Sequence, residues 1–177
     1  MNKKGGKVKK MLPEDTGSVI RFLNAFLDKS TKLVQHLDTQ INILIGTSSA
    51  IFLFASSQSF GQSQFLNQHF IIITIASGLS AFIALFAIHP PRFMRKRGQA
   101  ESVLYNKKIS SLKSFKEFKS QVVDLTTNKD AMIEQYSIEI YNLAKYYYKP
   151  KRMLFHLSRN ILMIGIVIYL LSFIINI

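Results

Sequence analysis

The 177-residue chain carries 23 Lys and Arg against 10 Asp and Glu, and 48% of its residues are hydrophobic. It contains no cysteine, which excludes disulfides, thiolate catalysis and cysteine-bound zinc or iron-sulfur centres. The apolar residues gather in three blocks separated by basic stretches, so the composition indicates a membrane protein rather than one soluble core.

The chain opens with residues 1–17, a lysine-rich segment without periodic apolar positions, which we expect to be a disordered basic arm. Residues 18–37 follow, and their apolar side chains recur mostly every three or four positions. These apolar residues are Ile20, Leu23, Phe26, Leu27, Leu33, Val34 and Leu37. The pattern predicts an amphipathic helix that runs straight into the first membrane span.

Residues 38–89 are predicted to form a transmembrane helical hairpin, with uncharged spans over 41–57 and 70–89. Asp38 precedes the first span, where a carboxylate is costly unless it is paired or hydrated. Asp38 is therefore either a solvated interfacial acid or a residue that couples helices. Small residues at Ala76, Ser80 and Ala84 allow close helix approach, either within one subunit or between copies in a homo-oligomer.

Residues 90–152 are predicted to form a basic helical hairpin between the second and third spans. Pro90 and Pro91 should end the second span, and Arg95 and Arg97 lie just after it, at the level of the lipid headgroups. We expect one amphipathic helix over 100–125, a turn over 126–130 and another amphipathic helix to about residue 148. These two helices should pack antiparallel, against the 18–37 helix or its copies.

The third span is predicted over residues 153–177, and Pro150 should kink the chain just before it. Such a kink would act as a hinge between the hairpin and the span. Lys145 and Tyr146 stand beside this point in a run of three tyrosines. The run resembles a membrane-interface aromatic belt, and also an aromatic and basic surface that could hold a nucleotide.

The distribution of Lys and Arg predicts the orientation in the membrane. Eight precede the first span and fifteen lie between His89 and Asn160, whereas the turn over residues 58–69 has none. Since short positively charged segments stay in the cytoplasm, we expect a cytoplasmic amino terminus, a cytoplasmic hairpin and an external carboxyl terminus. The predicted fold class is an all-α membrane protein with three transmembrane helices, a cytoplasmic amphipathic helix and a cytoplasmic helical hairpin.

No arrangement in the sequence indicates catalysis. There is no nucleophile and base pair, no glycine-rich phosphate loop and no carboxylate pair at a useful spacing. The four histidines, His36, His69, His89 and His156, are scattered without a metal-binding spacing. We therefore expect no catalytic residues, no metal and no cofactor.

Short patterns in the chain resemble the transmembrane effectors of the Pycsar antiphage systems. They are an Asp before the first span in LDTQINILIG, a long basic helical insert, and a Lys-Tyr pair before the last span in NLAKYYYKPKRMLFHLSRNILM. Asp38 matches the acid, and Lys145 with Tyr146 matches the pair. Gln40 stands where the family is expected to have a Lys. The resemblance implies a bacterial inner-membrane protein that detects a cyclic pyrimidine mononucleotide, cUMP or cCMP, and impairs the membrane during phage infection.

We therefore expect a non-enzymatic effector whose partners are the lipid bilayer, a cyclic mononucleotide and further copies of itself, without specific nucleic acid. Arg95, Arg97, Lys145 and Tyr146 are the predicted ligand-binding residues, and Asp38 and Pro150 the predicted coupling residues. The alternatives are a constitutive membrane scaffold or small channel subunit without a nucleotide ligand, and an anchor that recruits nucleic acid through its basic arm.

Overall fold

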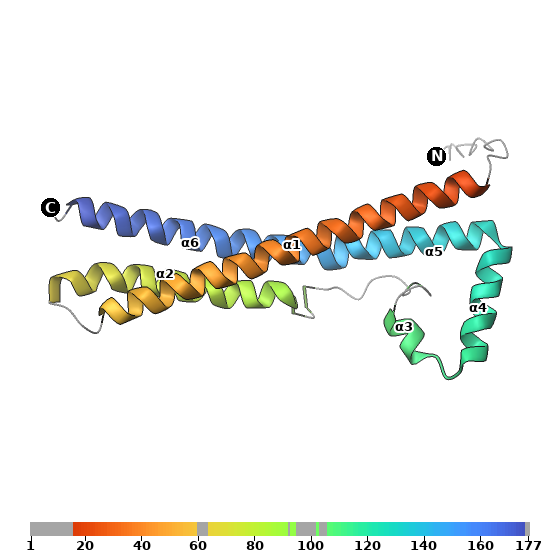
Figure 1. The fold of residues 1–177 in the computed structure, drawn as a ribbon, viewed down its shortest axis with the longest axis horizontal. Coiled ribbons are helices and arrows are strands. Elements are labelled where there is room, and N and C mark those ends of the chain that lie inside the picture. The colour runs from red at the N-terminus through yellow and green to blue at the C-terminus, as the bar shows by residue number, and fades with distance from the viewer. Residues whose placement is uncertain (1–15, 60–63, 92, 95–101, 103–105, 176–177) are drawn as a thin grey trace, which may run out of the picture. The chain divides into compact units, whose positions relative to one another are not determined.

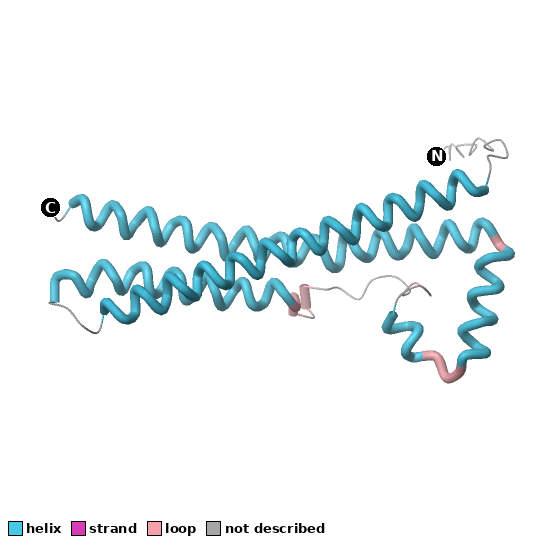
Figure 2. Tube along the Cα trace, in the orientation of Figure 1, coloured by secondary structure: helices cyan, strands magenta, loops and turns pink. Residues whose placement is uncertain are grey.

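The computed structural model describes residues 16–59, 64–91, 93–94, 102 and 106–175. Over these residues the chain is helical without strands, as Figure 2 shows, which confirms the predicted fold class. The basic arm up to residue 15 and the predicted ligand residues Arg95 and Arg97 lie outside the described residues.

Three of the helices are long and apolar enough to cross a membrane, within Gly17–Ser59, Phe70–Ile88 and Lys129–Ser172. They belong to α1 (Thr16–Ser59), to α2 (Gln64–Ile88) and to the continuous path of α5 (Lys129–Asn142), the π-helix η1 (Leu143–Tyr148) and α6 (Lys149–Ile175). Figure 1 labels the α-helices. Large apolar side chains such as Ile43, Ile75 and Leu170 are about half exposed or more, as expected of surfaces that face lipid. The three predicted spans are confirmed.

The chain divides into two compact units. One combines Met1–Lys29 with Glu101–Glu139, and the other combines Ser30–Ala100 with Ile140–Ile177. The second unit contains the greater part of α1, all of α2, η1 and α6, and two clusters of buried apolar side chains. The candidate functional residues that the structure describes all lie in this spanning unit.

Helix α1 confirms that the amphipathic segment continues into the first span without interruption. Its buried positions in the spanning unit are Leu37, Ile41, Leu44, Ser48 and Ala55, which step by 4, 3, 4 and 7 residues and so share one helix face. That face packs against Ala84 and Ala87 of α2 and Leu162 of α6. The small alanine side chains let the helices approach closely.

The prediction of one helix over residues 100–125 is wrong. Helix α3 (Asn106–Ser111) ends before Leu112, and α4 (Phe115–Thr127) begins after Ser114. The Ser114 hydroxyl accepts a hydrogen bond from the Glu117 amide at 3.3 Å, and the Glu117 carboxylate accepts one from the Lys113 amide at 3.1 Å. These reciprocal bonds satisfy amide donors at a helix start, so they favour a new helix here over the continuation of α3.

The turn predicted over residues 126–130 is shorter than expected, because Asn128 alone separates α4 from α5. Its side-chain oxygen accepts hydrogen bonds from the amides of Asp130 and Ala131, at 3.1 and 3.2 Å, and so caps α5. No residue of α4 or α5, all of which the structure describes, is buried. Phe115 remains 78% exposed.

The kink predicted at Pro150 falls just after a π-helical segment, and the helical path is not interrupted there. Helices α5, η1 and α6 follow one another without a gap from Lys129 to Ile175. Pro150 has no amide hydrogen, and in an α-helix its ring would clash with the carbonyl of Tyr146. The turn before it widens instead, and the Lys149 amide donates to the carbonyl of Ala144, five residues earlier. The chain therefore accommodates the proline with a π-helical turn.

Candidate functional site

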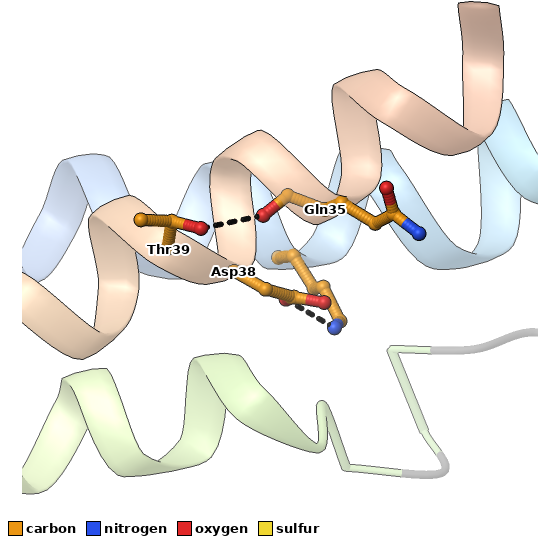
Figure 3. Close-up of polar contacts among 4 residues, drawn as sticks. Gln35, Asp38 and Thr39 are labelled. Carbon is orange, nitrogen blue, oxygen red and sulfur yellow. Dashed lines mark hydrogen bonds and ion pairs between the residues drawn. The ribbon is translucent and has the colours of Figure 1, made fainter.

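Asp38 is paired, and its partner comes from the far end of the sequence. Its carboxylate accepts a hydrogen bond from the Lys151 ammonium at 2.5 Å, joining α1 to α6 (Figure 3). The Lys151 side chain is only 11% exposed, whereas that of Asp38 is 39% exposed. The lysine is therefore the more desolvated partner and depends more strongly on the pair.

Sequence reasoning missed Lys151, although it singled out Asp38. The helix positions explain the contact: Leu37 and Ile41 are buried on either side of Asp38 along α1, and they pack with Leu154 and Phe155 of α6. Gln40 stands where the resemblance implies a lysine. Its side-chain nitrogen, Nε2, lies 3.2 Å from the Nε2 atom of His36. The ion pair near this acid is thus made by α6 rather than by the next turn of α1.

A chain of three serine hydroxyls crosses the interior of the spanning unit. The Ser80 hydroxyl lies 3.0 Å from that of Ser48 and 2.9 Å from that of Ser158, and the Ser158 hydroxyl donates to the Ser80 carbonyl at 2.7 Å. All three side chains are fully buried. Since an unpaired hydroxyl in the membrane interior is costly, this serine chain ties α1, α2 and α6 in one register.

The row of small residues on α2 is used inside one chain. Ser80 and Ala84 are fully buried, and Ala76 lies beside Gly165 of α6. The sequence left open whether this row joins helices of one subunit or of several. In the structure this row lies against α6 and α1 of its own chain.

Lys145 and two tyrosines form a second polar group on the same helical path. The Lys145 ammonium donates a hydrogen bond to the Tyr141 hydroxyl and lies 4.8 Å from the Tyr141 ring centre and 5.8 Å from that of Tyr146. The hydrogen bond to Tyr141 raises the pKa of the Lys145 ammonium above its usual value. This tyrosine and lysine cluster places an ammonium group beside two aromatic rings, before the point where the third span begins.

The structure brings Asp38, Lys145, Tyr146 and Pro150 into one unit and joins Asp38 to α6 through Lys151. Pro150 is buried between Lys149 and Lys151, directly after η1. No cluster of three or more His, Cys, Asp or Glu able to hold a metal ion occurs among the described residues. The exposed ammonium of Lys145 can attract an anion, and the Asp38–Lys151 pair joins α1 to α6.

Comparison with known proteins identifies the family. The model of the Pycsar effector protein domain matches residues 22–176, which include the Asp38–Lys151 pair, the serine chain and the tyrosine and lysine cluster. No curated protein and no solved structure matches the chain significantly. The name of this family does not denote an enzyme. The chain therefore belongs to the Pycsar effector protein domain family and is a multi-pass membrane effector of antiphage defence.

Proposed function

We propose that this effector senses a cyclic pyrimidine mononucleotide, cUMP or cCMP, and then impairs the bacterial inner membrane to abort infection. The observation that carries the proposal is the position of the tyrosine and lysine cluster. Lys145 precedes Lys151 by six residues, about 9 Å along a helix, and Lys151 holds α1 to α6 through Asp38. An anion captured at the cluster would act close to the contact that fixes the spans.

The chemistry of the cluster suits such a ligand. The Lys145 ammonium is exposed, so a nucleotide phosphate can replace the Tyr141 hydroxyl as its acceptor. The rings of Tyr141 and Tyr146 lie 6.0 Å apart in an edge-to-face arrangement, and either face can stack on a pyrimidine base. Arg95 and Arg97 are proposed as further phosphate contacts from the segment that follows α2.

The π-helix offers a mechanism for coupling. Its hydrogen bonds join residues five apart, whereas those of an α-helix join residues four apart. Conversion of η1 to an α-helix would therefore rotate the following helix by about 100°, the angle that one residue adds in an α-helix. Even part of that rotation would separate Lys151 from Asp38 and Ser158 from Ser80. A ligand that prefers one geometry of η1 therefore shifts the packing of the spans. Pro150, which favours the wide turn, would set the resting state.

Lys145→Ala is expected to weaken binding of cUMP or cCMP to the purified full chain by about 10 to 100-fold, because one charge-assisted hydrogen bond to phosphate is lost. Isothermal titration in detergent measures the affinity. Lys149→Ala, an exposed lysine one turn further on, is the matched control and should retain the parental affinity. Arg95→Ala with Arg97→Ala tests the remaining predicted contacts in the same assay.

Equal affinity of the Lys145→Ala variant and the parent would place the ligand elsewhere. If neither cUMP nor cCMP binds the parent at millimolar concentration, the proposal fails, and a constitutive membrane scaffold or small channel subunit becomes the better account. In infected cells, the Lys145→Ala variant should insert normally but lose the growth arrest that the parent shows. Normal growth arrest by a variant that no longer binds nucleotide would contradict the sensing role.

The proposal also requires the nucleotide site to face the cytoplasm, with the amino terminus inside and the carboxyl terminus outside. The absence of Lys and Arg from residues 58–69 supports this orientation. A reporter fused after Lys108 should therefore be active on the cytoplasmic side, and one inserted at Gln64 should be active outside. A cytoplasmic signal at Gln64 would contradict both the orientation and the proposed path of the ligand.

A further inference from the structure

Two cations, Arg152 and Arg159, lie on α6 where the third span begins and form what we call the cation row. Arg152, His156 and Arg159 are spaced by four and three residues, so they share one face of the helix. The Arg152 Nε atom donates to the Nε2 atom of His156 at 3.3 Å. Both arginines are exposed, and Arg159 lies eight residues beyond Lys151, about 12 Å further along the helix.

The guanidinium groups of this cation row are positioned by aromatic rings. Arg152 lies 5.9 Å from the ring centre of Tyr148, and Arg159 lies 5.9 Å from that of Phe155. Tyr148 and Phe155 in turn pack against the buried cluster of Leu37, Ile41 and Ala87. The cations therefore rest on the packed core and lose less conformational entropy when they bind an anion than free side chains would.

The protein supplies no counter-ion for this row among its described residues. Residues 140–177 contain five Lys and Arg and no Asp or Glu. Asp38 is the acid of the spanning unit, and it is occupied by Lys151. The hydrogen bonds of Arg152 and Arg159 go to the side chains of His156 and Asn160, neither of which is an acid. A cation at the level of the membrane needs an anion, and the nearest remaining source is the lipid.

An apolar stripe continues from the cations along the same face of α6. Met163, Val167 and Leu170 follow Arg159 by four, eight and eleven residues, and they are 55%, 51% and 53% exposed. From Arg159 to Leu170 the helix rises about 16 Å, close to half of a ~30 Å hydrocarbon layer. The face thus offers cations at headgroup level and an apolar surface as long as one leaflet.

We propose that this face binds an anionic phospholipid, with its phosphate between Arg152 and Arg159 and one acyl chain along Met163, Val167 and Leu170. Arginine suits this role because its planar guanidinium donates two parallel hydrogen bonds to phosphate oxygens. His156, between the arginines, provides a further donor from its other ring nitrogen. The lipid supplies the counter-ion that the protein lacks and fixes the depth of α6 in the membrane. The inference is independent of nucleotide sensing.

Lipid retention by the full chain tests the proposal. The purified protein is mixed with equal amounts of phosphatidylglycerol and phosphatidylcholine, and native mass spectrometry counts the lipids that remain bound. The parent should retain phosphatidylglycerol preferentially. The Arg152→Gln, Arg159→Gln variant should lose about tenfold or more of that preference, and Arg152→Lys, Arg159→Lys should lose less because the charges remain. Lys113→Gln with Lys116→Gln removes two exposed cations elsewhere and should leave the preference unchanged.

Equal preference for phosphatidylglycerol in the parent and the glutamine variant would overturn the proposal. So would loss of bound phosphatidylglycerol when 10-fold excess inorganic phosphate is added, since that result identifies a site for soluble anions. If the glutamine variant keeps its lipids but changes oligomeric mass, the face contacts a second copy instead. The lysine variant keeps the test valid should the glutamine variant fold poorly, because its charge and approximate size are retained.

Discussion

Gly165→Ala should destabilise the spanning unit by about 1–3 kcal/mol, the cost typical of forcing an extra methyl group into a packed interior. A Cβ atom at Gly165 would lie 2.2 Å from the Cβ atom of Ala76, and the Ala76 Cα atom is 3.7 Å away. Because both close atoms belong to or adjoin the α2 backbone, no side chain can rotate to make room. The two helices must separate. Thermal unfolding of the purified protein in detergent measures the loss.

Two other glycines provide controls for this prediction. Gly46→Ala places its methyl group where no atom lies within 4 Å, so the variant should unfold at the parental temperature or slightly above it. Gly78→Ala meets the Phe52 ring at 3.1 and 3.2 Å, but that ring is 38% exposed and can turn aside. An intermediate effect is expected there. Equal melting temperatures for Gly165→Ala and Gly46→Ala would show that α2 and α6 do not approach as closely as described.

The spans could be predicted from sequence because each is a long uncharged block, and hydropathy alone requires such a block to cross a membrane. The helix against which the small residues of α2 pack could not be predicted in this way. Ala76 and Ser80 allow close packing against any helix, and the choice of α6 depends on Gly165 and Ser158 standing at the same depth in an antiparallel neighbour. That register is set by the whole packed interior rather than by the pattern within α2.

The start of a new helix after α3 could have been predicted from the sequence, since Ser114 and Glu117 have the spacing of a capping box. The amphipathic pattern of 100–125 obscured it. Pro150 was read correctly as a disturbance of the helix, but the sequence does not reveal whether a proline breaks, kinks or widens a helix, because the outcome depends on the packing of the neighbouring turns.

The candidate site was predicted in part. Asp38 attracted attention because a carboxylate at the membrane boundary requires a partner. Lys151 is 113 residues away, and its pairing depends on the third span starting at the same depth as the first. The first and third spans cross the membrane in the same direction, so charged residues near their starts lie at similar depth. Pairing such residues by opposite charge would have proposed Lys151 as the partner of Asp38. This pairing would also have offered Lys149 and Arg152, and only the helix face decides among them.

A double-mutant cycle on the ion pair should show that Asp38 and Lys151 stabilise the spans together. Asp38→Asn is expected to cost about 1.5–3 kcal/mol, because it leaves the ammonium of Lys151, only 11% exposed, without its charged partner. Lys151→Met should cost less, since the Asp38 side chain is 39% exposed and water can solvate it. The double variant should lose less stability than the sum of the single variants, with a coupling of about 1–2 kcal/mol.

Lys149→Met is the matched control for this cycle, because Lys149 lies on the same helix, is exposed and takes no part in the pair. Its effect should be additive with Asp38→Asn within about 0.5 kcal/mol. If the pair holds the resting packing that the signal from Lys145 releases, the double variant should bind nucleotide with parental affinity but arrest growth without infection, because this contact no longer holds α1 to α6. Additive effects of Asp38→Asn and Lys151→Met would mean that the contact contributes nothing to stability. If the double variant also arrested growth only as the parent does, the ion pair would be excluded from the response as well.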